Sequence, residues 1–227
     1  MTGSAVPIDL WLWQLDCDAA EADRRRAVLN DAERARADRF VHNRDRTRFI
    51  SGRSRLREIL SGHVGTSATN LALQLGPNGK PFLPDGPQFN LSHAAGMAAL
   101  ALTVDMSVDL GVDIEGARTV DPGLDAHVFA PDERAALGAV DPSLRDWAFF
   151  LGWTRKEAVV KAMGEGLRAD LGSFAVTLHP DLPATVSRID GQTPDDWRLY
   201  NFRPRPDLAG AIACRTGGRE ITVTHRS

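Results

Sequence analysis

The hydrophobic pattern predicts that strands and helices follow one another in two successive groups. Residues 6–15 loosely alternate polar and apolar side chains, which favours a strand. Residues 19–60 have a helical pattern with a predicted break near 41–43, and the second of the two helices is expected to end at Gly62. The apolar run 97–104 then predicts a buried strand.

The second group begins with a cleanly alternating segment, residues 108–115. A short turn separates it from the run 97–104, so we expect the two segments to form a hairpin. A proline followed by acids predicts a helix start at 130–133, and residues 143–163 give the strongest helical pattern, which ends at Gly164. Four more strands are expected, at 174–178, 197–202, 209–214 and 220–225. This order predicts the α+β class.

Composition changes this picture little. The 227 residues suffice for one large domain or two small ones, and the net charge of −3 gives no general attraction to nucleic acid or anionic lipid. The two cysteines have no metal-ligand spacing, which favours a reducing compartment. We see neither a signal peptide nor an apolar run of membrane-spanning length, so the sequence predicts a cytoplasmic protein without a membrane partner.

The basic residues are unevenly divided between arginine and lysine. Only three of 27 are lysines, namely Lys80, Lys156 and Lys161. A bias toward arginine explains why lysine is rare but not where these three lie. Each lies in a segment with other candidate functional residues, and the compact ammonium group of lysine suits a single phosphate oxygen.

The segment 108–115 places acids on one face of a strand. One face would carry Asp109, Gly111, Asp113 and Glu115, and the other Val108, Leu110, Val112 and Ile114. Asp113 and Glu115 then lie about 7 Å apart, so both can converge on one hard cation in the manner of a magnesium site. Gly111 would allow a close approach to the backbone. Taken alone, the pattern also fits an ordinary solvated strand face.

The helix predicted at 143–163 carries a second set of charges. Helical spacing puts Trp153, Glu157 and Lys161 on one stripe, with Lys156 beside them. Glu157 can supply a third metal carboxylate, and the two lysines can hold phosphate oxygens. The alternative is a surface pair between Glu157 and Lys161, which would stabilise the helix by ~0.3–0.5 kcal/mol and do nothing else.

Two further candidates lie at turns. Lys80 stands between a glycine and a proline, and Ser92-His93 precedes the apolar run 97–104. The hydroxyl and the imidazole can bind phosphate there. A nucleophilic triad is disfavoured because its members are rarely sequence neighbours and no third member is evident. On local sequence alone, a turn or capping role explains His93 slightly better.

The order of these motifs resembles the larger, surfactin-synthetase-activating type of 4′-phosphopantetheinyl transferase. The resemblance covers about residues 33–178. The matching blocks are Arg-Phe at 39–40, Arg-Asp at 44–45, Gly-Arg at 52–53, Gly-Lys-Pro at 79–81, Phe-Asn-Leu-Ser-His at 89–93, Gly-Val-Asp-Ile-Glu at 111–115, Val-Phe-Ala-Pro-Asp-Glu at 128–133, Phe-Leu-Gly-Trp-Thr-Arg-Lys-Glu-Ala at 150–158 and Lys-Ala-Met-Gly-Glu-Gly-Leu at 161–167.

This resemblance implies two similar α+β halves, here 1–107 and 108–227, related by a pseudo-two-fold axis, with coenzyme A bound in the cleft between them. It implies transfer of the 4′-phosphopantetheine arm of coenzyme A to a serine of an apo acyl or peptidyl carrier protein, with release of 3′,5′-ADP. The reaction would depend on Mg²⁺, or on Mn²⁺ in its place. The carrier would serve fatty acid, polyketide or nonribosomal peptide biosynthesis, and the enzyme would be a monomer.

The resemblance also assigns residues. Asp113, Glu115 and Glu157 match the metal ligands, and we take Glu157 as the general base, acting directly or through water. The matching coenzyme A contacts are Arg36, Arg53, Lys80, Ser92, His93, Lys156 and Lys161. In three places the chain departs from the family pattern: Glu33 and Arg36 replace two common lysines, Glu165 replaces a lysine and Asn78 replaces an aromatic residue. The 3′-phosphate contact therefore stays open among Arg36, Arg48 and Arg53.

Two other functions remain open from the residues alone. The same carboxylates would suit a different magnesium phosphotransferase or a nucleotide hydrolase. The segment 24–57, with twelve arginines against four acids, would suit a non-catalytic module that binds nucleic acid, although the net charge of −3 weakens this reading. Carrier recognition is expected near 120–137.

Overall fold

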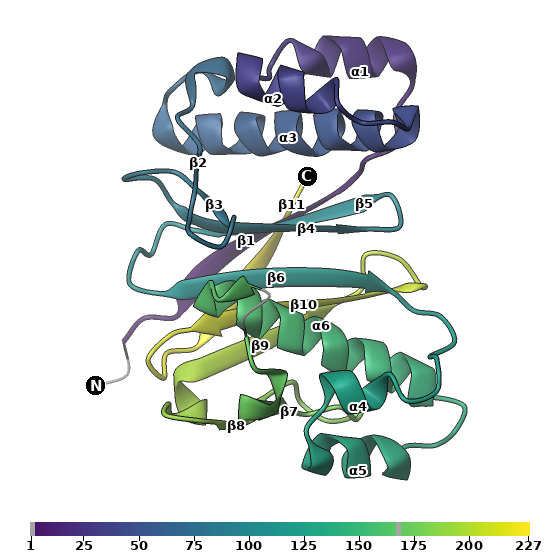
Figure 1. The fold of residues 1–227 in the computed structure, drawn as a ribbon. Coiled ribbons are helices and arrows are strands. Elements are labelled where there is room, and N and C mark those ends of the chain that lie inside the picture. Colours follow the sequence, from purple (N-terminus) through teal and green to yellow (C-terminus); the bar gives the residue numbers. More distant parts are fainter. Residues whose placement is uncertain (1–2, 167–168) are drawn as a thin grey trace.

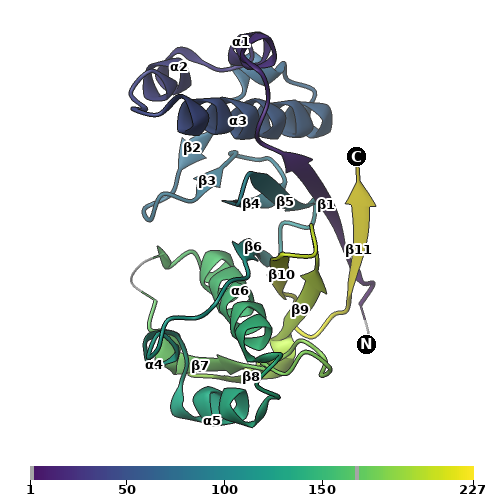
Figure 2. The same ribbon diagram turned by 90° about the vertical axis from the view of Figure 1, so that its right-hand side faces the viewer.

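The computed structural model describes residues 3–166 and 169–227 and confirms a mixed α+β class. Its elements form stacked layers: helices, a sheet, a second sheet, and further helices (Figure 1). The first helical layer consists of α1 (Ala19–Arg26), α2 (Asp31–Ala37) and α3 (Asn43–Val64). The view turned by 90° shows the same order of layers (Figure 2).

The first sheet contains both ends of the chain. Its strand order is β11 (Ile221–Arg226), β1 (Val6–Gln14), β5 (Met97–Thr103) and β4 (Gln88–Ala94). The C-terminal strand β11 pairs in parallel with β1, so the end of the chain returns to the sheet built from its beginning (Figure 2). A two-stranded ribbon of β2 (Gln74–Leu75) and β3 (Pro81–Phe82) lies beside this sheet.

The second sheet has the order β6 (Asp109–Gly116), β10 (Leu208–Arg215) and β9 (Trp197–Phe202). Around it lie α4 (Asp125–Val128), α5 (Pro131–Ala139), α6 (Arg145–Met163) and the pair β7 (Phe174–Val176) and β8 (Val186–Ile189). The predicted helix starting at 130–133 and the long helix ending at Gly164 are both confirmed. Among the described residues no helix has the length and apolar composition needed to cross a bilayer.

The helices predicted for residues 19–60 are confirmed only in part. The break near 41–43 is confirmed, but a second break separates α1 from α2, where Asn30 caps α2 in a reciprocal arrangement with Glu33. The helix α3 also runs past Gly62 to Val64. Glycine inside a helix is only weakly unfavourable, whereas Gly65 has φ 69° and ends the helix in the left-handed conformation.

The predicted hairpin between 97–104 and 108–115 is wrong. The strand β5 pairs with β1 and β4, whereas β6 pairs with β10 in the other sheet. The apolar side of β6 faces the first sheet, so the two segments meet through side-chain packing instead of a shared ladder. Between β4 and β6 the Asn90 Oδ1 accepts a hydrogen bond of 2.8 Å from the Val112 N–H.

The helix α6 lies against the opposite side of β6, and Gly111 makes this close packing possible. A Cβ atom at this position would lie 2.0 Å from the Ala158 carbonyl oxygen and 2.5 Å from the Ala162 nitrogen. Real Cβ atoms do not approach backbone atoms so closely, so only glycine fits here. The expectation of a close backbone approach at Gly111 is thereby confirmed, and the approaching element is α6.

We predict that Gly111→Ala lowers the free energy of unfolding by about 3 kcal/mol, because β6 and α6 must separate to admit the methyl group. Urea denaturation measures this loss. Gly62→Ala is the matched control, since no heavy atom lies within 4 Å of the added Cβ and Gly62 is exposed within α3. It should raise stability by roughly 0.5–1 kcal/mol. Equal stability of Gly111→Ala and wild type would contradict the packing.

Candidate functional site

The strand β6 brings acids to the face that α6 covers. The four side chains assigned by sequence to the core all lie in the apolar cluster between the sheets: Val108, Leu110, Val112 and Ile114. Asp113 lies on the opposite face and is only 3% exposed, while Glu115 is half-buried. Because α6 crosses β6 at Gly111, the half-buried Glu157 of α6 comes close to these two acids.

Asp113 is held by residues from two other elements. Its Oδ1 accepts a hydrogen bond of 2.8 Å from the Ser92 hydroxyl on β4 and lies 2.6 Å from the Lys161 ammonium on α6. Lys161 also donates to the Ser92 Oγ at 3.0 Å. The structure therefore joins three predicted site residues in one network, in which a lysine cation balances a buried carboxylate.

The carboxylates of Asp113, Glu115 and Glu157 interact electrostatically. Burial raises the pKa of Asp113, and the nearby Lys161 opposes this rise. Burial also raises the pKa of Glu115 and of Glu157, and in both cases the charge of Asp113 raises it further. Such crowding of like charges in a partly buried place costs stability and is typical of functional sites.

These carboxylates suit a divalent cation. Asp113 Oδ2 is buried and has no hydrogen-bond partner among the described residues, although a buried carboxylate oxygen normally has one. Oxygen ligands from two or three carboxylates match the preference of Mg²⁺. No group of three or more His, Cys, Asp or Glu residues within 3–166 and 169–227 is already drawn together tightly enough to hold a metal. The three carboxylates are thus neighbours, and a bound cation would have to draw them closer together.

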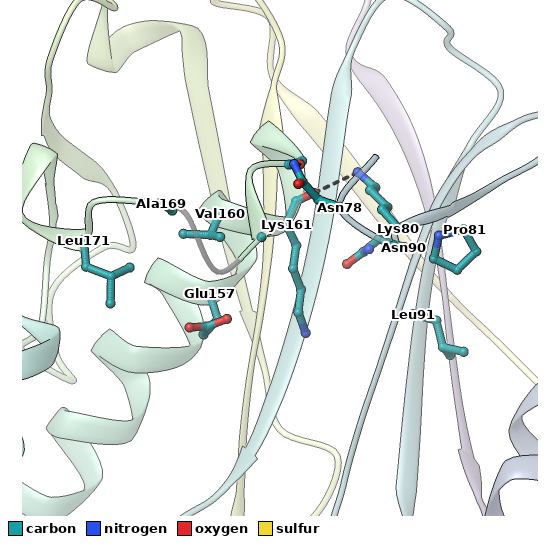
Figure 3. Close-up of a pocket in the computed structure, with 13 residues that line it drawn as sticks. Asn78, Lys80, Pro81, Asn90, Leu91, Glu157, Val160, Lys161, Ala169 and Leu171 are labelled. Carbon is teal, nitrogen blue, oxygen red and sulfur yellow. Dashed lines mark hydrogen bonds between the residues drawn. The ribbon is translucent and has the colours of Figure 1, made fainter. Parts of the chain in front are cut away.

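A cavity of about 420 Å³ opens beside these residues (Figure 3). Glu157 and Lys161 enter its wall from α6, and Lys80 and Asn90 lie on the opposite side. The Lys80 Nζ donates hydrogen bonds of 2.8 Å to the carbonyl oxygens of Leu110 and Lys161. Lys80 therefore stands at the cavity and also ties the turn before β3 to both β6 and α6. The cavity's apolar lining is Pro81, Leu91, Val160, Ala169 and Leu171.

A second cavity of about 500 Å³ adjoins the first, since Leu91 lines both. Its lining includes four basic or imidazole side chains, namely Arg36, Arg48, Arg53 and His93. It lies between α2, α3 and the turn that joins β4 to β5. Five of the seven predicted coenzyme A contacts line one or the other of these two neighbouring cavities.

The arginines of the second cavity differ in how they are engaged. Arg48 makes a two-pronged ion pair with Asp16 at 2.6 and 2.8 Å. The Arg53 guanidinium lies 3.6 Å from a carboxylate oxygen of Glu33 and is largely buried, which lowers its pKa. Arg36 makes no ion pair with any described residue and lies 5.1 Å over the ring of Phe49. Arg36 is therefore the cation with most freedom to meet an anion.

The structure does not bring Lys156 to either cavity. Its side chain is 1% exposed, and its Nζ lies 2.6 Å from the Glu133 Oε2 and 2.8 Å from the Phe174 carbonyl oxygen. The expected phosphate contact therefore has no geometric support, because α6 directs this lysine into the core formed with α5 and β7. Sequence reasoning also missed the role of Glu133, although its place three residues into α5 carried the signal of a capping acid.

Comparison with known proteins agrees with these motifs. Residues 109–214 match the model of the 4′-phosphopantetheinyl transferase superfamily, and residues 16–105 match that of the 4′-phosphopantetheinyl transferase N-terminal region. The 4′-phosphopantetheinyl transferase HetI of Nostoc sp. is 33% identical over an alignment 225 residues long, which covers 96% of this chain and 92% of that protein.

Two further similarities complete the comparison. The 4′-phosphopantetheinyl transferase Sfp of Bacillus subtilis is 27% identical over 205 residues, 89% of this chain and 90% of that protein. The crystal structure of Thermotoga maritima holo-[acyl-carrier-protein] synthase covers 48% of this chain and 63% of its own, with a TM-score of 0.39 and 14% identity. On the strength of the sequence matches, the chain belongs to the 4′-phosphopantetheinyl transferase family.

Proposed function

We propose that this protein transfers the 4′-phosphopantetheine arm of coenzyme A to a serine of an apo acyl or peptidyl carrier protein and releases 3′,5′-ADP. One observation carries the proposal. Asp113 of β6 pairs with Lys161 of α6, and Lys161 and Glu157 line a cavity that adjoins a second, basic cavity. Coenzyme A is a long molecule with a phosphorylated nucleotide at one end and a thiol arm at the other, and the two adjoining cavities match those ends.

The basic cavity suits the nucleotide end. Arg36 is the preferred partner of the 3′-phosphate because it has no ion pair to break, with His93 and Arg53 beside it. Arg48 is less suited because its guanidinium already makes a bidentate ion pair with Asp16. The pantetheine arm would then extend past Leu91 into the cavity that Lys80 lines.

Between the two cavities, the residues of the network around Asp113 would bind and orient the diphosphate of coenzyme A. Asp113, Glu115 and Glu157 would hold Mg²⁺, or Mn²⁺, which when bound supplies positive charge to the phosphate oxygens. Ser92 keeps Asp113 oriented through its hydrogen bond, and the half-buried Lys161 can offer its ammonium to a phosphoryl oxygen.

Glu157 is the proposed general base. Its half-buried carboxylate lines the cavity and would accept the proton directly or through a water molecule. The carrier serine oxygen forms a bond to the phosphorus next to pantetheine, its proton passes to Glu157, and the bond to the 3′,5′-ADP oxygen breaks. Alignment of the two substrates and stabilisation of charge would supply most of the rate.

The nucleic-acid alternative loses support from the ion pairs of the segment 24–57. Of its twelve arginines, ten lie within 4 Å of a carboxylate: Arg24, Arg25, Arg26, Arg34, Arg44, Arg46, Arg48, Arg53, Arg55 and Arg57. Cations that are paired within the protein contribute less to phosphate binding. The internal pseudo-symmetry, the division at residue 107, the monomeric state and the cytoplasmic location stay predictions.

We predict that incubation with coenzyme A, Mg²⁺ and a purified apo carrier adds the mass of one phosphopantetheine arm to the carrier, as measured by mass spectrometry. A phosphotransferase or hydrolase of another kind would instead consume coenzyme A without a carrier. If no carrier gains this mass while coenzyme A is cleaved, the proposed function is wrong.

We predict that Glu157→Gln lowers kcat by about 10²–10⁴-fold, the range typical of a lost general base. The variant should melt at the same temperature as the wild type or above it, because it removes one of three crowded negative charges. The pair of measurements separates loss of chemistry from loss of fold. A variant that keeps wild-type kcat would refute the role of Glu157.

We predict that Arg36→Met raises the KM for coenzyme A by about tenfold, since a charged hydrogen bond contributes roughly 1.5–3 kcal/mol. It should not change the KM for 3′-dephospho-coenzyme A, which lacks the phosphate in question. Arg39→Met is the control, because Arg39 is exposed and does not line the cavity. Equal effects of Arg36→Met on both substrates would exclude the 3′-phosphate contact.

His93 lines the same cavity, and His93→Ala should also raise the KM for coenzyme A more than it lowers kcat.

A further inference from the structure

Three successive residues of α6 are charged, and their side chains leave the helix in three directions. Consecutive positions of an α-helix are rotated by about 100°. Glu157 lines the cavity, whereas Arg155 and Lys156 are fully buried on other sides of the helix. Whatever fixes the directions of Arg155 and Lys156 therefore also fixes the direction of Glu157.

Lys156 is fixed by a closed set of contacts around Glu133. The ion pair between them is 2.6 Å long, and the two side chains are 1% and 2% exposed. Glu133 also accepts hydrogen bonds from the Ala130 N–H at 2.9 Å and the Val176 N–H at 2.8 Å. Lys156 in addition donates to the Phe174 carbonyl and lies 4.4 Å from the centre of the Phe174 ring. The pair thus binds α6 to the start of α5 and to β7.

Arg155 provides a second attachment. Its Nε donates to the Asn201 Oδ1 at 3.1 Å, on β9, and its Nη1 donates to the Thr177 carbonyl oxygen just after β7. No carboxylate balances this guanidinium among its contacts, and burial lowers its pKa to about 10. Its hydrogen bonds hold α6 from another side than the Lys156 contacts do.

We propose that Lys156, through its buried pair with Glu133, is a positioning residue that sets the rotation of α6 so that Glu157 lines the cavity, and that Lys156 does not itself contact coenzyme A. A buried ion pair stabilises a fold little compared with apolar residues of the same size, but in some proteins it serves to specify one arrangement of its partners. Here the constraint would act on α6, the helix that carries Glu157. This inference rests on the proposed function for Glu157.

Steady-state kinetics of three variants test the proposal: Lys156→Met, Glu133→Gln and the double variant. Glu133 lines neither cavity, so its substitution leaves every proposed coenzyme A contact in place. We expect each variant to lower kcat at least tenfold and to leave the KM for coenzyme A within threefold of wild type. The double variant should be no slower than the slower single variant, because both changes break one contact.

The double variant also protects the test against misfolding, since it leaves neither Lys156 nor Glu133 as an unpaired buried charge. Thermal unfolding shows whether each variant folds. Arg226→Met is the control, because it removes an ion pair between an exposed arginine of β11 and Asp9, neither of which lines either cavity, and it should keep wild-type kcat. If Lys156→Met instead raises the KM for coenzyme A tenfold or more while Glu133→Gln behaves as wild type, Lys156 is a phosphate ligand and the proposal is overturned.

A second readout does not depend on the transfer reaction. Mn²⁺ alone should raise the melting temperature of the wild type, and it should raise that of the double variant by less than half as much, because the direction of Glu157 is no longer fixed. An equal shift in both proteins would overturn the positioning role even if no carrier were ever modified. If the double variant loses the shift and the wild type transfers nothing to a carrier, the positioning role is supported and only the proposed reaction is wrong.

Discussion

The close contact between the backbones of α6 and β6 is the constraint on which the site depends. It exists because residue 111 has no side chain, and a methyl group there would lie 2.0 Å from the Ala158 carbonyl oxygen. At this distance the functional face of the helix is brought directly over the acids of the strand. Asp113 thereby meets Lys161 at 2.6 Å, and the charges of Asp113 and Glu157 act on each other.

This contact gathers more negative charge than the fold alone would favour. The pKa values of Asp113, Glu115 and Glu157 are all raised by burial, and the Lys161 ammonium opposes the rise at each of them. A cation bound here would relieve the repulsion, and so the cost in stability prepares the site for its ligand. Lys80 contributes on the other side by tying β6 and α6 to the turn before β3.

Sequence patterns predicted the parts that depend on local order. The alternation over 108–115 put Asp113 and Glu115 on one face, and helical spacing put Glu157 beside Lys161, both as found. The same patterns failed where partners lie far apart in the chain. An apolar run next to an alternating segment suggested a hairpin, yet β5 and β6 belong to different sheets, and β11 crosses to pair with β1.

The sequence by itself determined which face of each element carries the acids and cations, because side-chain direction follows from the period of the strand and the helix. Only the tertiary structure decided which of those groups meet. Lys156 shows the difference, since its neighbour Glu157 faces the cavity while Lys156 is directed to a buried acid 23 positions away in sequence. Such a choice depends on how helices and sheets pack, which is decided by contacts between distant segments and leaves no periodic signal in the chain.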